Sequence, residues 1–184
     1  MSGLLVEKIG GPPVYTYDIP ESFKPAPAGK GEALYRRSVY TFWRRTGPAP
    51  MLEAFDVPKR VVCVARRDTT NTSLQALVLL NGPQFVEASR VLAEKLLKEQ
   101  TTDAARIDQL SILLLSRPAT AKEQQIFAKS LAAFRADYAA KPAEAAKLLK
   151  AGEKPVDPKL PPNEVAAWTL VCSQMFNRDE TLNK

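Results

Sequence analysis

The spacing of hydrophobic residues changes near residue 70 of this chain. Before that point, apolar side chains gather in two short runs, residues 38–43 and 60–64, that are rich in β-branched and aromatic types and bounded by turn formers. Runs of this length and composition predict β-strands, and we expect the two to pair as antiparallel neighbours. A helix across residues 33–45 is the alternative for the first run. Residues 51–55, between the runs, predict a single helical turn.

After residue 70 the apolar positions recur at three- and four-residue steps, which is the period of an α-helix. Thr120, followed three positions later by Glu123, has the spacing of a capping box and predicts the start of a helix. The segments with a helical pattern are 74–81, 83–99, 107–115, 120–138, the short alanine-rich 142–150, and 165–176. We expect a mainly α protein with about five helices in one bundle-like domain and a small two-stranded β element.

Residues 1–33 are rich in Gly and Pro, and each Pro disfavours helix in the residue before it. This composition predicts an extended arm whose apolar side chains need a surface to cover, and we expect part of that surface to belong to sequence outside this chain. The predicted organisation is therefore an arm at 1–33 and a single α-rich domain at 34–184. Within that domain, 34–70 form an arginine-rich β element and 71–184 the helical part.

Composition excludes several chemistries. The chain has no His and two Cys, so it holds no Ser-His-Asp or Cys-His nucleophile, no imidazole base and no zinc site of the usual kinds. We predict no metal and no cofactor. Cys63 and Cys172 are expected either to form one long-range disulfide, if the protein is exported, or to remain free thiols. No apolar stretch approaches the length of a membrane-spanning helix, and no signal segment follows Met1.

Positive charge is concentrated in one region. The chain has a net charge of +6, and residues 36–67, with eight basic and two acidic side chains, carry a net charge of +6 by themselves. The candidate anion-binding residues are the arginine doublets Arg36, Arg37, Arg44, Arg45, Arg66 and Arg67. Arginine doublets of this kind either pair with carboxylates and helix ends of their own fold or bind an external sulfate, carboxylate or phosphate.

Two other functions are open to these residues. Aromatic side chains between arginines suit single-stranded nucleic acid, but no predicted helix carries a basic stripe, so we predict no nucleic-acid partner. Glu53 with Asp56, or Asp68 beside Arg66 and Arg67, are the available acid/base pairs. Pairs of this kind occur in any protein with twenty acidic residues, and we predict no catalytic residue.

Several separated strings resemble one family. They are residues 35–46 (YRRSVYTFWRRT), 55–58 (FDVP), Arg67 with 70–72 (TNT), 74–81 (LQALVLLN), 2–5 (SGLL), 9–12 (IGGP), and 166–168 (AAW) with 175–180 (MFNRDE). Together they are similar to planctomycete domain of unknown function 1553, the PSD-one-type domain at the C-terminal end of large exported proteins. The family pattern starts upstream of Ser2, so the chain is expected to be the C-terminal part of that domain.

The resemblance implies a periplasmic or extracellular setting and a multidomain parent protein that can also carry a cytochrome-c-like module. It implies no established activity and supplies no catalytic or haem-binding residue. We therefore expect a non-enzymatic accessory or interaction module whose partner is the rest of the parent polypeptide or an acidic protein or glycan. The alternative is part of a carbohydrate- or ester-hydrolysing enzyme that is completed by N-terminal sequence outside this chain.

Overall fold

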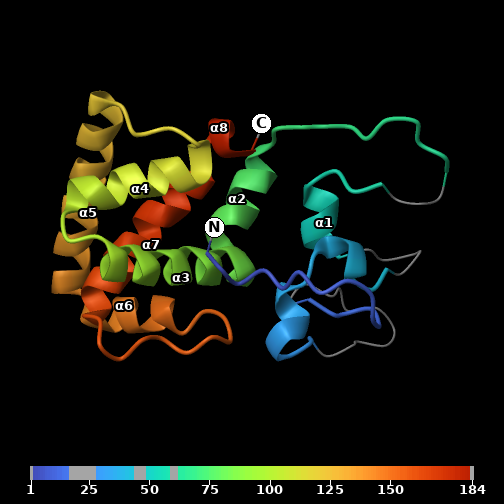
Figure 1. Ribbon diagram of the computed structural model, residues 1–184, viewed down its shortest axis with the longest axis horizontal. Coiled ribbons are helices and arrows are strands. Elements are labelled where there is room, and N and C mark those ends of the chain that lie inside the picture. The colour runs from blue at the N-terminus through green and yellow to red at the C-terminus, as the bar shows by residue number, and fades with distance from the viewer. Residues whose placement is uncertain (1, 17–27, 44–48, 59–61, 183–184) are drawn as a thin grey trace. The chain divides into compact units, whose positions relative to one another are not determined.

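The computed structural model describes residues 2–16, 28–43, 49–58 and 62–182 (Figure 1). These residues contain eight α-helices, two short 3-10 helices and no β-sheet, which confirms the mainly α fold class. The chain divides into two compact units. We call Leu4–Val78 the N-terminal unit, and Met1–Gly3 together with Leu79–Lys184 the helical unit.

The predicted pair of β-strands is wrong. In the N-terminal unit, Gly31–Tyr35 and Ser38–Tyr40 are 3-10 helices (η1 and η2), and Pro50–Ala54 is a short α-helix (α1), as the helical turn at 51–55 predicted. Residues 62–64 have no strand structure, and 59–61 lie outside the described residues. Within 33–43, the described part of the alternative helix over 33–45, the structure has the two 3-10 helices instead.

The backbone of residues 35–42 bonds to the N-terminal arm instead of to a second strand. Isolated parallel bridges join Val6 to Arg36 and Val14 to Thr41. The Val14 N–H donates to the Tyr40 carbonyl, and the Phe42 N–H donates to the Val14 carbonyl, both at 2.8 Å. Backbone groups that find partners in this arm are not available to a hairpin.

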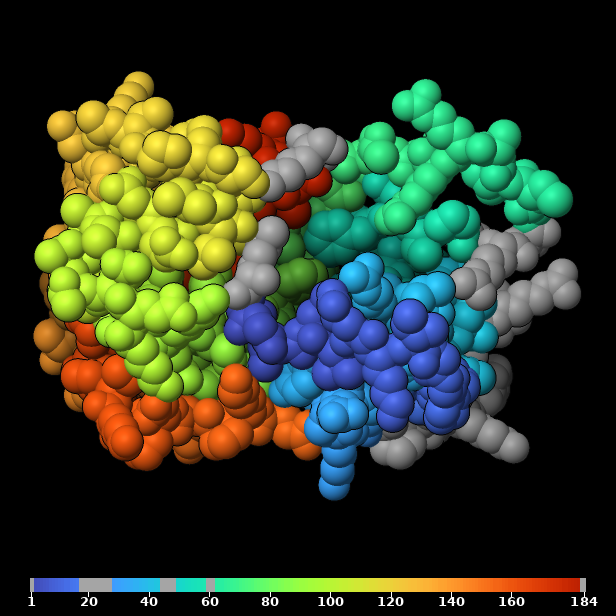
Figure 2. Space-filling model, in the orientation of Figure 1, coloured from blue at the N-terminus to red at the C-terminus, as the bar shows by residue number. Residues whose placement is uncertain are grey.

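Residues 4–16 of the arm lie on the chain itself, whereas the end of the predicted arm, from Gly31, belongs to the 3-10 helix η1. Val14 and Thr16 are buried, and the rings of Tyr15 and Phe42 are 5.0 Å apart. Figure 2 shows the arm in dark blue over the lighter blue residues that follow it. The surface covered by residues 4–16 is thus at least partly internal to the chain, whereas Tyr17 and the rest of the predicted arm up to residue 27 lie outside the described residues.

The helical unit is built around one buried helix. Its elements are α3 (Pro83–Glu99), α4 (Asp103–Leu115), α5 (Ala121–Ala140), α6 (Pro142–Leu149), α7 (Pro162–Phe176) and α8 (Asp179–Leu182). Helix α7 contacts α3, α4, α5 and α6. Trp168, Val171, Cys172 and Met175 of α7 are fully buried among leucines of the other helices. The expected five helices were too few, because short segments such as α1 and α8 are also helical.

Local signals set the helix ends. The Thr120 hydroxyl accepts from the Glu123 N–H while the Glu123 carboxylate accepts from the Thr120 N–H, which confirms the predicted capping box of α5. Helices α3, α6 and α7 each begin with Pro, which lacks the N–H that would be unpaired at that position. Helix α4 ends at Ser116 in the left-handed conformation, with φ of 61°.

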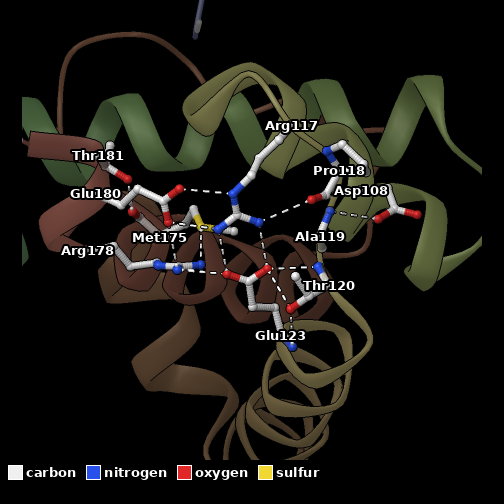
Figure 3. Close-up of polar contacts among 10 residues, drawn as sticks. All are labelled: Asp108, Arg117, Pro118, Ala119, Thr120, Glu123, Met175, Arg178, Glu180 and Thr181. Carbon is white, nitrogen blue, oxygen red and sulfur yellow. Dashed lines mark hydrogen bonds and ion pairs between the residues drawn. The ribbon is translucent and has the colours of Figure 1, made fainter. Parts of the chain in front are cut away.

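An ion-pair cluster joins the start of α5 to the residues that follow α7, including α8 (Figure 3). The guanidinium of Arg117 bonds to both Glu123 and Glu180, and Arg178 contacts the same two carboxylates. Hydrogen bonds from Arg117, and then from the Thr120 backbone, hold the pKa of Glu123 far below its usual range. This cluster fixes the turn between α4 and α5 against the C-terminal residues.

In helix α2 (Ser73–Asn81), the polar side chain of Gln75 faces inward and three of the four leucines face outward. Gln75 and Leu79 are buried, whereas Leu74, Leu77 and Leu80 are 45–56% exposed. The periodic leucines that indicated this helix are therefore not its buried face. Gln75 is inward because it belongs to the polar site described below.

No helix within the described ranges is long and apolar enough to cross a bilayer. Both cysteines are free thiols, Cys63 at the surface and Cys172 in the core.

Candidate functional site

Arg36 holds the arm. Its guanidinium donates to the carbonyl oxygens of Lys8 at 3.0 Å, Pro12 at 3.3 Å and Gly10, and it lies 3.8 Å from the centre of the Tyr40 ring. The Tyr40 hydroxyl accepts from the Gly10 N–H at 3.1 Å. With both terminal nitrogens bonded to backbone carbonyls, Arg36 shapes the turn of the arm and offers little to an external anion.

Arg37, Arg66 and Arg67 are the described arginines of the predicted set whose side chains are exposed, and of these Arg37 and Arg66 form no bond to a backbone carbonyl of the described residues. Arg37 lies 3.4 Å from Glu7, and both side chains are mostly exposed, at 62% and 73%. Arg66 is exposed and makes no hydrogen bond or ion pair with the described residues. Arg44 and Arg45 lie outside the described residues.

Arg67 holds a second backbone turn. Its Nε donates to the carbonyl oxygen of Asp56 at 2.9 Å, and its terminal nitrogen donates to that of Phe55. Asp56 follows α1 in the left-handed conformation, with φ of 55°, which Asp tolerates better than most residues do. Each described doublet therefore has one arginine that bonds to backbone carbonyls, Arg36 or Arg67, directly beside one that does not, Arg37 or Arg66.

The Asp56 carboxylate ties this turn to the start of α2. It accepts from the Thr70 N–H at 2.7 Å, from the Thr70 hydroxyl at 2.8 and 2.9 Å, and from the Gln75 amide at 3.4 Å. The side-chain and backbone bonds from Thr70, and the charge of Arg67, lower the pKa of Asp56. Asp56 is thus ionised at neutral pH and occupied by donors of its own fold, which suits a structural anchor better than a proton donor.

Gln75 completes the network. The side-chain amide nitrogen of Gln75 donates to the Thr70 hydroxyl at 3.1 Å, and its side-chain oxygen accepts from the Thr72 backbone N–H at 3.1 Å. The backbone N–H of Gln75 donates to the Thr72 hydroxyl at 3.3 Å. The segments 55–58 and 67–75 therefore meet around one carboxylate.

A surface hollow of about 290 Å³ adjoins this network. Its lining residues are Glu53, Asp56, Val57, Pro58, Val64, Arg67 and Asp68. Glu53 and Asp68 are exposed and form no ion pair with the described residues, so the hollow offers two carboxylates beside apolar contacts. Across the ranges that the structure describes, no three His, Cys, Asp or Glu side chains are placed to hold a metal ion.

The structure brings Arg67, Asp56, Thr70 and Gln75 into one hydrogen-bonded network. The sequence patterns contain these residues but do not predict that they are in contact. The available signal was that 55–58, Arg67 with 70–72, and 74–81 all carry the family resemblance. Their convergence on one network is a structural reason for their occurring together.

Comparison with known proteins gives one family. A model of the family described as a protein of unknown function (PSD1, DUF1553) matches residues 1–131. Neither the curated proteins nor the solved structures include a match to this chain.

Proposed function

Since the chain belongs to the DUF1553 family of proteins of unknown function, we propose that it is a non-enzymatic accessory or interaction module of a larger exported protein. It docks an acidic partner, a glycan or a protein face, through exposed arginines of the N-terminal unit. Arg37 and Arg66 are the described members of this surface, and Arg44 and Arg45 join it on the basis of sequence alone.

The proposal rests on one observation. In each described arginine doublet, one arginine bonds to backbone carbonyls and its neighbour does not. Arg36 and Arg67 bond to backbone carbonyls, so they fix the main chain at positions 36 and 67. Their neighbours Arg37 and Arg66 thereby present guanidiniums from a fixed backbone, which reduces the entropy lost on binding. In the ion pair between Arg37 and Glu7 both side chains are exposed, and exposed pairs of this kind are weak. An anionic ligand that binds Arg37 more tightly therefore displaces Glu7 at little cost in free energy.

The test measures binding of a sulfated and a carboxylated polysaccharide to the full chain at low and high salt. The double variant Arg37→Gln/Arg66→Gln is expected to lose roughly tenfold in affinity at low salt, since two exposed charge pairs at about 0.2–1 kcal/mol each contribute at most about 2 kcal/mol. Lys122→Gln/Lys129→Gln is the matched control, because it removes two exposed charges from α5. Equal losses in both double variants, or no binding by the wild-type chain at low salt, would refute this role for the arginines.

The hollow supports a second candidate, a hydrolytic role on carbohydrate or ester in a site completed by other sequence of the parent protein. Glu53 and Asp68, both lining the hollow, are its candidate acid/base groups. Turnover of a glycan or ester panel by the parent protein, abolished by Glu53→Gln or Asp68→Asn and retained in Glu32→Gln, would favour this candidate over the binding module.

A further inference from the structure

Helix α3 carries a row of buried charges that the arginine surface does not involve. Glu87, Arg90 and Glu94 lie on one face of α3, and their side chains are between 0 and 7% exposed. Arg90 donates to Glu94 at 2.7 Å and lies 3.8 Å from Glu87. The row is therefore one connected network inside the helical unit.

The same network holds the loop between α6 and α7. A Glu87 oxygen accepts from the N–H groups of Glu153 and Lys154 at 2.9 and 2.7 Å, and Arg90 donates to the Lys154 carbonyl at 2.5 Å. Gly152 has φ of 87°, and a Cβ there would lie 2.2 Å from Glu87. The loop is thus pinned to α3 through its main chain, which leaves the Lys154 side chain at the surface.

Burying three charges costs free energy. A buried ion pair is weak evidence of a stabilising role, because apolar residues of similar size in its place often give equal or greater stability. A polar network does fix geometry. Here it orients the carboxylate of Glu94 and the backbone of Lys154, which come from two segments about 60 residues apart. Both residues line the same surface hollow.

That hollow has a volume of about 240 Å³ and is lined by Ser2, Val91, Glu94, Lys95, Lys98, Glu99 and Lys154. Three lysines face two glutamates, so the lining is net positive. Lys98 pairs with Asp157 at 2.6 Å and Lys95 lies 4.0 Å from Glu99. Lys154 is exposed and forms no side-chain ion pair with the described residues.

We propose that this hollow binds a small polyhydroxylated anion, a sugar acid or a sugar phosphate. Lys154, helped by Lys95, pairs with the anionic group, while the fixed Glu94 carboxylate accepts a hydrogen bond from a sugar hydroxyl. The hollow is smaller than the roughly 300–1,000 Å³ of sites for drug-sized ligands, so it suits a single sugar residue. This site is independent of the proposed arginine surface.

The test titrates the full chain with glucuronate, glucose 6-phosphate, glucose and inorganic phosphate, followed by calorimetry and by NMR shifts of α3 and residues 152–156. At least one of the first two is expected to bind more tightly than both glucose and phosphate. Binding of glucuronate alone identifies a sugar acid, and binding of glucose 6-phosphate alone identifies a sugar phosphate. No binding of either, or glucose or phosphate binding as tightly as the tighter-binding of the two, overturns the proposal.

Lys154→Gln keeps the backbone contacts that pin the loop and is expected to weaken binding about tenfold. Glu94→Gln keeps an acceptor for Arg90 and tests the hydroxyl contact, with an expected loss of several-fold in affinity for the sugar ligand and little change for phosphate. Lys129→Gln on α5 is the matched control. A loss in this control equal to that in Lys154→Gln would show that only general charge is involved and would overturn the site. Arg37→Gln/Arg66→Gln is expected to leave this binding unchanged.

Discussion

Arg117 and Glu123 meet through two parallel hydrogen bonds of 2.9 Å, one to each oxygen of the carboxylate. This two-point geometry is the strongest form of an Arg–carboxylate contact. The same carboxylate caps the start of α5, so a single side chain serves both the cap and the ion-pair cluster.

Glu123→Gln is expected to lower the free energy of unfolding at pH 7 by about 1 kcal/mol after allowance for the solvent exposure of Arg117. The amide keeps the cap but loses the charge. Urea unfolding measures the effect, and Glu144→Gln, which removes an exposed pair with Lys147, is the control. Equal unfolding midpoints for the two variants would contradict the assigned role of Glu123.

Stability should depend on pH with a definite sign. The pKa of Glu123 and of Glu180 is lower in the fold than the ordinary value of 4.5, chiefly because of hydrogen bonds from Arg117. Their contribution is therefore fully present above pH 4.5 and is lost as the pH falls from there toward the lowered values. Glu123→Gln should show a smaller loss of stability than wild type between pH 5 and 3, and an identical loss would exclude this cause.

Arg36→Lys is expected to loosen the arm while keeping the charge. One ammonium group cannot reach three carbonyl oxygens in the fork geometry of a guanidinium. Amide hydrogen exchange at Val6 and Gly10 should accelerate roughly tenfold. In Arg37→Lys, the neighbouring control, exchange at these amides should match wild type, and similar acceleration in both variants would rule out the clamp.

Asp56→Ala is expected to release the segment that precedes α2. The change removes the acceptor of the Thr70 N–H and places Ala in the left-handed conformation. Exchange of the Thr70 amide should become faster, while amides of the helical core should keep their protection. Asp68→Ala removes a carboxylate from the same hollow without touching the Thr70 bond and should leave that amide protected.

Gly152→Ala is expected to destabilise the helical unit by more than about 1–3 kcal/mol, the usual cost of a strained backbone alone, because its Cβ would also meet Glu87 at 2.2 Å. Gly31→Ala is the matched control, since Gly31 has φ of 58° and open space at the Cβ position. Thermal unfolding compares the two variants. Equal destabilisation would mean that backbone strain alone accounts for the effect.

A chain that ends at residue 131 is expected not to fold cooperatively. The match to the family model ends inside α5, whereas the central helix α7 lies beyond it. Loss of α7 removes the side chains of Trp168 and Met175 from the core. Circular dichroism and the dispersion of NMR signals measure this, with the 1–184 chain as the reference. A cooperative unfolding transition in the 1–131 chain would contradict the central role of α7.

The helices could be predicted where the signals are local. Pro83, Thr120 and Glu123 mark helix starts through contacts with their immediate neighbours, and α3 and α5 begin where these residues predict. The run 38–43 gave the opposite result. Its β-branched and aromatic composition reflects a preference for half-buried extended surroundings, and in the fold the N-terminal arm supplies those surroundings without a sheet.

The charge of the candidate site could be predicted from the sequence, but the contacts of its arginines could not. Arg36 is distinguished from Arg37 by the carbonyl groups it reaches, which belong to residues 24 to 28 positions away. Backbone carbonyls leave no trace in a residue pattern, so no spacing rule separates the anchored arginine from the exposed one. The buried position of Gln75 has the same origin, since Asp56 lies 19 positions before it.

Helix α2 has a practical consequence for work with the purified chain. It contains no charged residue and turns three leucines toward solvent, and exposed apolar faces of this kind promote adhesion between molecules and to surfaces. Replacement of Leu74 and Leu77 by Gln or Lys should therefore improve solubility and yield, because Gln75 and Leu79 on the opposite face keep their packing.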